Sequence, residues 1–259
     1  MRQPEIITSS ANPLLKEVRR AISRGELTSR GWCVAETIHL LEEALRSDCR
    51  VQAVITGETM RTPVQGIVGE RNDVRMLVVP DKLLQDSSQG VVTLVEFRQT
   101  QKALESRPLS LIVDGVQDPG NLGTIIRSAE AFGASALLLM KGTVYSLSPK
   151  VVRASAGSVF RVHIKQCLDD EAVAGGLWGS AARVYAAVPN GAISLANADL
   201  TGECAVIVGS EGHGIRPALR ALAQDVTIPT MGVESLNAAV AASIILYEAR
   251  RQRSGYEPV

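Results

Sequence analysis

Two polar loops near the end of the chain could hold and orient a small ligand. The loop GSEGHG (209–214) follows an apolar run and contains Glu211. The loop IPTMGVESLN (228–237) precedes an apolar helix and contains Ser235 and Asn237. Carboxylates, hydroxyls and amides all form hydrogen bonds, and loops at the carboxyl ends of neighbouring parallel strands are the usual ligand site of an α/β sheet. The sequence therefore predicts a cofactor pocket at these loops.

A third loop, DGVQDPGNLGT (114–124), adds an amide and leads into a helix that carries a guanidinium group. Asn121 lies in the turn, and Arg127 lies near the end of the second helical turn. The glycines lack the G-x-G-x-x-G spacing of a dinucleotide site, and the chain has no G-x-x-x-x-G-K-[ST] phosphate loop. A Rossmann dehydrogenase and a P-loop enzyme are therefore disfavoured. Arg127 faces either a ligand cleft or a structural carboxylate partner.

The histidines and cysteines do not predict a metal site. His39, His163 and His213 are far apart in the sequence, and the four cysteines include no C-x-x-C pair. The first residues lack the apolar segment of a secretory signal, and no apolar run approaches the roughly 18 residues that cross a bilayer. We expect a reduced, cytoplasmic protein with no metal and no membrane partner.

Apolar runs separated by helical patterns predict an α/β fold for the second part of the chain. Runs of this kind suit strands that are buried on both faces of a parallel sheet. Six strands are expected, at residues 109–116, 136–140, 162–165, 184–188, 204–210 and 226–229.

The first hundred residues predict a smaller α/β layer. Asn12 and Pro13 supply a cap and a first-turn proline for a helix that ends near Ser23. Short strands and helices alternate after it. The polar stretch RQTQKALESRP (98–108) marks a domain boundary. We therefore expect a first domain at 1–100, a linker at 101–108 and a second domain at 109–259.

Basic residues gather in two places although the whole chain is neutral. Lysine plus arginine and aspartate plus glutamate both number 27. Residues 1–30 hold six basic and three acidic residues, and residues 148–165 hold four basic and no acidic residue. The first stretch is either a solvated helix face or a surface that contacts phosphate. The second is expected at the ligand edge of the second sheet, where a basic patch suits an RNA backbone. The residues expected to touch RNA are Lys16, Arg19, Arg20, Lys150 and Arg153.

The last helix has an apolar stripe that is expected to pack against another part of the protein or another chain. Ser235 is expected to cap this helix, and Val240, Ile244 and Tyr247 recur at helical spacing. The small residues at 238–242 allow another helix to approach closely. A homodimer that buries the stripe is the predicted assembly.

Three stretches in series resemble the SpoU (TrmH) family of RNA 2′-O-ribose methyltransferases. They are residues 114–133, 208–215 and 228–242, and their order and spacing match the family across residues 109–253. The stretch PKVVRASAG (149–157) is also similar. The first hundred residues resemble the ribosomal-protein-like substrate-binding domain of many family members.

The resemblance implies a SPOUT fold, in which the parallel-sheet domain ends in a deep trefoil knot, a rare exception to unknotted topology. It implies S-adenosyl-L-methionine (AdoMet) as the cofactor, and dimers whose active sites are completed by the partner chain. The implied cofactor contacts are Gly209, Ser210, Gly212, Ile228, Met231 and Leu236. The implied catalytic residues are Asn121, Arg127, Glu211, Ser235 and Asn237.

The resemblance also suggests how these residues divide the work. It casts Arg127 as the base, although guanidinium chemistry favours a milder role, in which it grips a phosphate and stabilises the developing alkoxide. Asn121 and Asn237 would orient the site. Glu211 would hold Arg127 or the ribose, and Ser235 would form a hydrogen bond nearby.

Ribosomal RNA is the expected substrate, because the extra first domain resembles that of rRNA-acting members. A tRNA 2′-O-methyltransferase is the alternative within the family. The alternative from another class is a non-catalytic RNA-binding or ribosome-assembly protein on the same fold. The presence of all five implied catalytic residues favours the enzyme.

Overall fold

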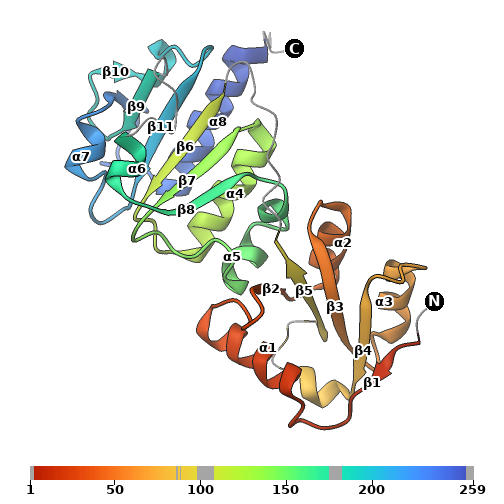
Figure 1. Ribbon diagram of the computed structural model, residues 1–259. Coiled ribbons are helices and arrows are strands. Elements are labelled where there is room, and N and C mark those ends of the chain that lie inside the picture. The colour runs from red at the N-terminus through yellow and green to blue at the C-terminus, as the bar shows by residue number, and fades with distance from the viewer. Residues whose placement is uncertain (1–2, 86, 88, 98–107, 175–182, 255–259) are drawn as a thin grey trace. The chain divides into compact units, whose positions relative to one another are not determined.

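The chain folds into two compact units (Figure 1). The computed structural model describes residues 3–85, 87, 89–97, 108–174 and 183–254. Unit 1 is Met1–Thr100 with Tyr145–Arg161, and unit 2 is Gln101–Val144 with Val162–Val259. The expected second domain includes 145–161, whereas the contacts of this segment group it with unit 1. Most of the expected linker lies outside the described residues.

Unit 1 is built on a five-stranded mixed sheet in the order β1-β4-β3-β5-β2. Strands β1, β4 and β3 pair in parallel, and β5 pairs antiparallel with both β3 and β2. The strands are β1 (Glu5–Ile6), β2 (Trp32–Ala35), β3 (Arg50–Gly57), β4 (Arg75–Val79) and β5 (Val91–Glu96).

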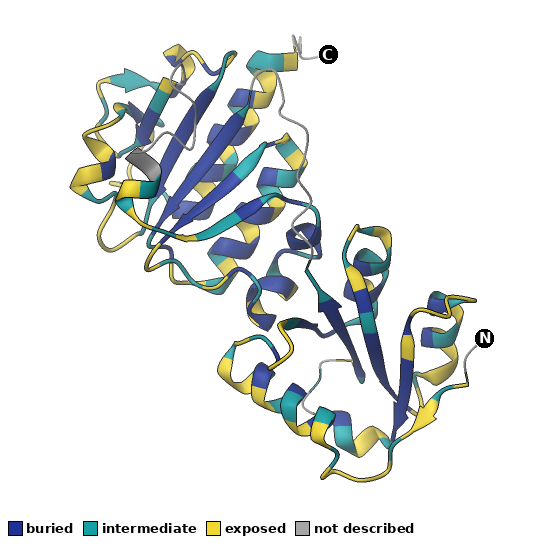
Figure 2. Ribbon diagram, viewed as in Figure 1, coloured by how far each residue is buried: buried dark blue, intermediate teal, exposed yellow. Residues whose placement is uncertain are grey.

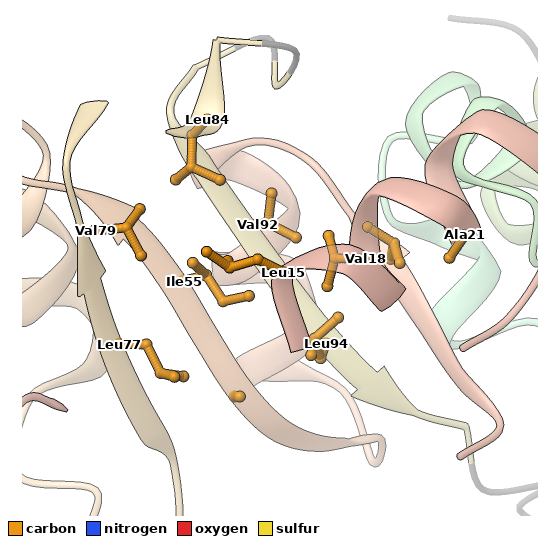
Figure 3. Close-up of a cluster of buried hydrophobic side chains, with 11 residues drawn as sticks. Leu15, Val18, Ala21, Ile55, Leu77, Val79, Leu84, Val92 and Leu94 are labelled. Atoms are coloured by element: carbon orange, nitrogen blue, oxygen red, sulfur yellow. The ribbon is translucent and has the colours of Figure 1, made fainter. Parts of the chain in front are cut away.

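Helix α1 (Pro13–Arg24) covers one face of this sheet. The Asn12 side chain accepts hydrogen bonds from two backbone N–H groups of the first turn, at 2.9 and 3.4 Å, and so begins the helix where the sequence predicts. Figure 3 shows its apolar side chains packed into the strands. The buried members of this cluster are Leu15, Val18, Ala21, Val34, Ala53, Ile55, Leu77, Val79, Leu84, Val92 and Leu94.

Helices α2 (Ile38–Arg46) and α3 (Arg61–Val68) pack against β3. The Thr37 hydroxyl accepts the Leu40 N–H at 3.1 Å and caps α2. No element is predicted from the sequence at α3, whose sequence RTPVQGIV includes a proline and a glycine, which disfavour helix interiors. Burial of its apolar side chains, Val64 among them, offsets that preference. The 3-10 turn η1 (Asp81–Leu84) follows β4.

Residues 145–161, the inserted segment, form the last part of unit 1. They fold into α5 (Pro149–Ala154) and the 3-10 turn η2 (Ser158–Phe160). Helix α5 packs against β2, and η2 packs against α2. Sequence analysis expects this stretch at the ligand edge of the second sheet, but within the chain it closes the β2 side of the first unit.

Two ion pairs fasten the inserted segment. Arg161 Nη1 lies 2.7 Å from Glu43 Oε2, and Arg153 Nη1 lies 3.9 Å from Glu36 Oε2. Gly157 has a φ of 88° and passes so close to Glu43 that a Cβ atom would collide with that side chain. Only glycine fits there without strain or clash.

Glu36 makes the stability of unit 1 depend on pH. The residue is 5% exposed, and burial raises its pKa above the ordinary 4.5, although Arg153 opposes the shift. The folded state therefore binds this proton more tightly than the unfolded state does. The contribution of Glu36 to stability is fully present below the unfolded pKa and is lost as the pH rises through the folded pKa.

The variant Glu36→Gln lacks this titration, so its stability relative to the wild type should increase between about pH 4 and about pH 7. Urea unfolding at both pH values measures the difference in the free energy of unfolding. Glu70→Gln, at an exposed glutamate of the same unit, is the matched control and should show no such trend. An equal difference at both pH values for Glu36→Gln would contradict the argument.

Unit 2 is built on a seven-stranded sheet in the order β10-β12-β9-β11-β6-β7-β8, and all neighbouring strands are parallel. The predicted parallel α/β sheet is confirmed. Figure 2 shows its central strands buried, as their apolar runs require. The strands are β6 (Leu109–Asp114), β7 (Ala136–Met140), β8 (Ile164–Leu168), β9 (Arg183–Ala187), β10 (Ile193–Ser194), β11 (Cys204–Gly209) and β12 (Gln224–Thr227).

Helices α4 (Pro119–Phe132) and α8 (Ala238–Ser254) pack against each other beside this sheet (Figure 1). The hydroxyl oxygens of Ser128 and Ser243 lie 2.7 Å apart across their contact. The short helices α6 (Asp170–Ala174) and α7 (Pro217–Arg220) also flank the sheet. Within the described residues, no helix has both the length and the apolar character that a membrane crossing needs.

Candidate functional site

The register of the unit 2 sheet brings four chain segments to one edge. Asp114, the last residue of β6, pairs with Gly209, the last residue of β11. Ala187, the last residue of β9, pairs with Val226 of β12. The segments that follow these strands therefore leave the sheet side by side, at the edge where parallel α/β sheets bind ligands.

An Asn–Glu–Asn cluster lies at this edge. Asn121 Nδ2 donates to Glu211 Oε1 at 3.1 Å. Asn237 Nδ2 donates to Asn121 Oδ1 at 3.1 Å and also to Glu211 Oε1. The three residues come from α4, the loop after β11 and the residue before α8. The structure thus joins three of the five residues that the family resemblance implies for catalysis.

The starts of two helices fix the amides of this cluster. Asp118 Oδ1 accepts the N–H of Asn121 at 2.7 Å and begins α4. Asn237 Oδ1 accepts N–H groups from the first turn of α8 at 2.9 and 3.3 Å. The predicted cap by Ser235 is wrong, because α8 starts at Ala238 and its cap is the residue immediately before it. The side-chain oxygen of Asn237 therefore caps the helix, and its side-chain nitrogen donates the hydrogen bonds that hold the cluster together.

A closed turn holds Glu211 in place. Ser210 N donates to Gly214 O at 3.2 Å, and Gly214 N donates back to Ser210 O at 2.9 Å. A Cβ atom on Gly209 would overlap the backbone of Gly214, so the turn can close only over a glycine. The glycine at position 209 is thus required because any larger residue would clash with the backbone across the turn.

Arg216 fastens the same loop to its neighbours, and sequence analysis does not identify it. Its backbone N and its Nε each donate to the Asp114 carboxylate at 2.8 Å. Nη1 donates to Asp170 Oδ1 at 2.9 Å, and Nη2 donates to Lys141 O at 2.8 Å. Asp114 is 3% exposed, and its hydrogen bond with Arg216 raises the pKa of the guanidinium. The available sequence signal is an aspartate that ends a buried apolar strand and therefore needs a partner.

Two hollows lie at this edge, next to the start of α8. The polar hollow is lined by Gly115, Val116, Gln117, Asp118, Asn121, Ser210, Glu211, Gly212, His213 and Ala238. The apolar hollow is lined by Ala187, Val188, Pro189, Val226, Ile228, Thr230, Glu234, Ser235, Leu236 and Ala241.

Four of the six residues expected to touch the cofactor line one of the two hollows, and Gly209 and Met231 line neither. Ile228 and Leu236 line the apolar hollow, whereas Ser210 and Gly212 line the polar one. The Met231 side chain is 97% exposed and lines neither. Ser235, expected to be catalytic, lines the apolar hollow.

Arg127 lies apart from the Asn–Glu–Asn cluster within one chain. It follows Asn121 by six residues on α4, which places it roughly 9 Å along the helix and about 120° around it. Its side chain is exposed. Among the described residues, Glu211 accepts from the two asparagines and forms no hydrogen bond with Arg127. Within the part of one chain that the structure describes, no hydrogen bond thus joins the guanidinium to the cluster.

Comparison with known proteins identifies the family. A sequence model of the SpoU rRNA Methylase family matches residues 108–247, more than half of the chain. The chain belongs to this family. An uncharacterized tRNA/rRNA methyltransferase of Synechocystis sp. is 33% identical over 95% of this chain and 94% of its own length. The 23S rRNA (guanosine(2553)-2′-O)-methyltransferase RlmP of Bacillus subtilis is 32% identical over 94% of this chain and 98% of its own.

Solved structures support the same assignment for the SpoU chain. The AdoMet-bound rRNA methyltransferase of Sinorhizobium meliloti has a TM-score of 0.82 and 29% identity, over 96% of this chain and 98% of its own. The SpoU methyltransferase AviRb of Streptomyces viridochromogenes has a TM-score of 0.82 and 26% identity, over 94% and 98% of the two chains. The SpoU chain is thus an AdoMet-dependent RNA methyltransferase.

The apolar hollow has the character that AdoMet requires. Pockets for such ligands combine apolar walls with a few polar groups that fix orientation. Val188, Ile228 and Leu236 supply apolar walls, and the hydroxyl residues Thr230 and Ser235 supply polar groups at the rim. The Thr227 hydroxyl donates to Pro189 O at 2.7 Å and ties the two strand ends that form the walls.

Proposed function

We propose that this SpoU chain transfers a methyl group from AdoMet to a ribose 2′-hydroxyl of ribosomal RNA. The observation that carries the proposal is the Asn–Glu–Asn cluster beside the apolar hollow, in a chain of this family. RlmP, which is similar over nearly the whole chain, is named as a 23S rRNA 2′-O-methyltransferase. Action on rRNA would place the chain in the cytoplasm, as its sequence leads us to expect.

AdoMet would be held by the segments around the apolar hollow. Ile228 and Leu236 would contact the adenine, and the backbone of the closed turn at Gly209, Ser210 and Gly212 would contact the rest of the cofactor. Met231 would have to turn inward to contribute. We also propose that the chain after about residue 205 is threaded as a trefoil knot. The support for this threading is the family resemblance over residues 108–247.

When bound, AdoMet supplies an activated methyl group. The residues of this chain must then align the ribose hydroxyl with that methyl and help it lose its proton. Both asparagine amides point at Glu211 Oε1, so Oε2 is the atom that we assign to the ribose hydroxyl. Asn121 and Asn237 would orient this carboxylate, and Ser235 would form a hydrogen bond at the border with the cofactor.

A homodimer would complete this site. Val240, Ile244 and Tyr247 are 46%, 36% and 50% exposed and form one stripe on α8. The Tyr247 ring also packs edge-on against Phe132 of α4, with centroids 5.8 Å apart. Burying this stripe against a second copy would bring the partner's α4 near the site. Arg127 of one chain would then serve the cluster of the other, where it would hold a phosphate and stabilise the developing alkoxide.

RNA would be positioned by unit 1, which we propose as the ribosomal-protein-like substrate-binding domain. The sequence predicts RNA contact at Lys16, Arg20, Lys150 and Arg153. It also predicts contact at Arg19, whose guanidinium donates to the carbonyl oxygens of Ser10 and Leu83 in the structure. This extra unit is the reason to favour rRNA over tRNA as the substrate.

Two measurements test the proposal. Calorimetric titration should show AdoMet binding, and its absence at millimolar cofactor would favour a non-catalytic RNA-binding protein. Ribose-methylation mapping of total RNA, from cells with and without the gene, should reveal one nucleotide that loses its methyl group. A change in tRNA rather than rRNA would select the alternative substrate, and no change in either would reject the proposed reaction.

A further inference from the structure

Two basic clusters that are far apart in the sequence meet within unit 1. Lys16, Arg20 and Arg24 are exposed and recur every four residues, so they form one stripe along α1. Lys150 and Arg153 are exposed on α5 of the inserted segment. Both helices pack against β2.

The end of α1 lies directly beside the start of α5. A Cβ atom on Gly25, which ends α1, would lie 3.9 Å from the Ser148 Cβ atom, and Ser148 caps α5. Arg24 precedes Gly25, and Lys150 follows Ser148 by two residues. The backbones of Arg24 and Lys150 are therefore within roughly 15 Å of each other.

We infer that these five cations form one continuous track that binds the sugar–phosphate backbone of a single RNA segment. The stripe on α1 covers about 12 Å, and Lys150 to Arg153 adds about 4.5 Å, so the track is on the order of 30 Å long. The five cations would contact phosphates and no base, so the track would position the RNA without selecting its sequence. The inference rests on the proposed function only for the identity of the RNA.

The surroundings of these side chains leave the track free to bind phosphate. Among the described residues, Lys16, Arg20, Arg24 and Lys150 form no ion pair with a carboxylate. Two carboxylates, Glu17 and Glu26, line the same hollow as Lys16 and Arg20. Glu17 accepts the N–H of Ser29 at 2.6 Å, and neither carboxylate forms an ion pair with a cation of the track among the described residues. Arg153 pairs with Glu36 at 3.9 Å but keeps half of its side chain exposed.

Arg19 is not part of the track, although it lies on the same helix. Its Nη2 donates to Leu83 O at 3.1 Å, and its Nη1 donates to Ser10 O at 3.4 Å. This guanidinium therefore ties α1 to its neighbouring loops. Arg24, which the sequence-based list of RNA contacts omits, takes its place at the end of the stripe that meets the inserted segment.

The salt dependence of RNA binding gives a quantitative test. A protein that neutralises five phosphates has a slope of roughly −3.5 to −4.5 when log affinity is plotted against log salt. Between about 50 and about 200 mM KCl, these contacts account for a loss of affinity of roughly 100- to 500-fold. The probe is a labelled RNA hairpin of about ten base pairs, close to the length of the track, and the protein is the full chain.

Two variants divide the track. Lys16→Gln/Arg20→Gln/Arg24→Gln should reduce the magnitude of the slope by roughly 2 to 3, and Lys150→Gln/Arg153→Gln by roughly 1.5. The matched control for the pair is Arg50→Gln/Arg61→Gln, which removes two exposed arginines from β3 and α3 and should leave the slope unchanged. Because Arg153 pairs with buried Glu36, Lys150→Gln alone is measured as well and should reduce the slope by roughly 0.8.

The inference is overturned if Lys150→Gln/Arg153→Gln and Lys150→Gln both leave the salt slope unchanged, as the control does. It is also overturned if the α1 variant leaves the slope unchanged, since the two helices then do not both contact the same short hairpin. Methyl transfer from labelled AdoMet is measured separately on total rRNA. If the wild type methylates no RNA, the proposed reaction fails, whereas the salt slopes still decide the track. If the wild type methylates rRNA and all slopes are equal, the track fails and the reaction stands.

Discussion

Replacing Arg127 with alanine is expected to slow methyl transfer by roughly 100-fold or more, because removing one group that stabilises developing charge has an effect of this size. AdoMet affinity should stay unchanged, since Arg127 lines neither hollow. Single-turnover transfer of labelled methyl to RNA measures the rate, and calorimetry measures the affinity. Arg127→Lys keeps the charge but loses the planar fork of donors, so it should recover only part of the rate.

The dimer hypothesis adds a sharper expectation, because it has Arg127 act on the partner's cluster. Subunits with Arg127→Ala keep the cluster, and subunits with Asn121→Ala/Glu211→Ala keep Arg127. In a mixed dimer, one of the two sites then contains every group. Random mixing of equal amounts should restore about one quarter of the wild-type activity, since half of the dimers are mixed and each has one complete site. An arginine that acts within its own chain would give no restoration.

The matched control is Lys141→Ala, which removes an exposed cation of the same unit and leaves the backbone oxygen that Arg216 uses. It should transfer methyl groups at the wild-type rate. Unchanged turnover in Arg127→Ala would remove this residue from the mechanism. Loss of AdoMet affinity in the same variant would instead indicate a structural role near the pocket.

The parts of the fold that follow from local chemistry could be predicted from the sequence. The apolar runs gave the parallel sheet, and Asn12 with Pro13 gave the start of α1. Helix α3 could not be predicted, since its proline and glycine oppose a helix that only tertiary burial stabilises. The cap of α8 was assigned to the wrong residue because Ser235 and Asn237 are both good caps, and their chain positions alone do not separate them.

The candidate site could be predicted only where its residues lie in recognisable loops. Asn121, Glu211 and Asn237 all lie in polar stretches that interrupt apolar patterns, although the structure places Asn121 in the first turn of α4, and they form one cluster. Asp114 opens the first loop motif, but Arg216 lies 102 positions later and no motif names it as the partner, so their pairing emerges only from the register of β6 with β11.

The inserted segment belongs to a unit that its position in the sequence does not indicate. Its sequence follows β7, yet its ion pairs join it to Glu36 and Glu43 of unit 1. Removing residues 1–100 would therefore strip the partners of 145–161 as well as the proposed RNA contacts. Point substitutions on the track separate RNA binding from folding, which such a deletion cannot do.

Replacing Arg216 with methionine is expected to lower both stability and catalytic rate. It leaves the Asp114 carboxylate, 3% exposed, without its charged partner. Breaking a fully buried pair costs about 3–5 kcal/mol, and the loss here should not exceed that range because the Arg216 side chain is 30% exposed. It also frees the loop that carries Glu211 from the ends of β6 and β7. Urea unfolding measures the loss of stability, and single-turnover methyl transfer measures the rate. Arg220→Met, which breaks the exposed pair with Asp225, is the control and should lower the stability far less, because solvent screens an exposed pair.

A double variant separates the two effects of Arg216. Asp114→Asn/Arg216→Met removes both charges but keeps a side-chain oxygen that can accept the N–H of residue 216. Because no unpaired charge remains buried, the double variant should regain much of the lost stability. The rate should stay low, since nothing then clamps the Glu211 loop to its neighbours, and the loss should appear in kcat more than in the KM for RNA. If the rate returns together with the stability, the pair serves only the fold, and Arg216 does not position the site.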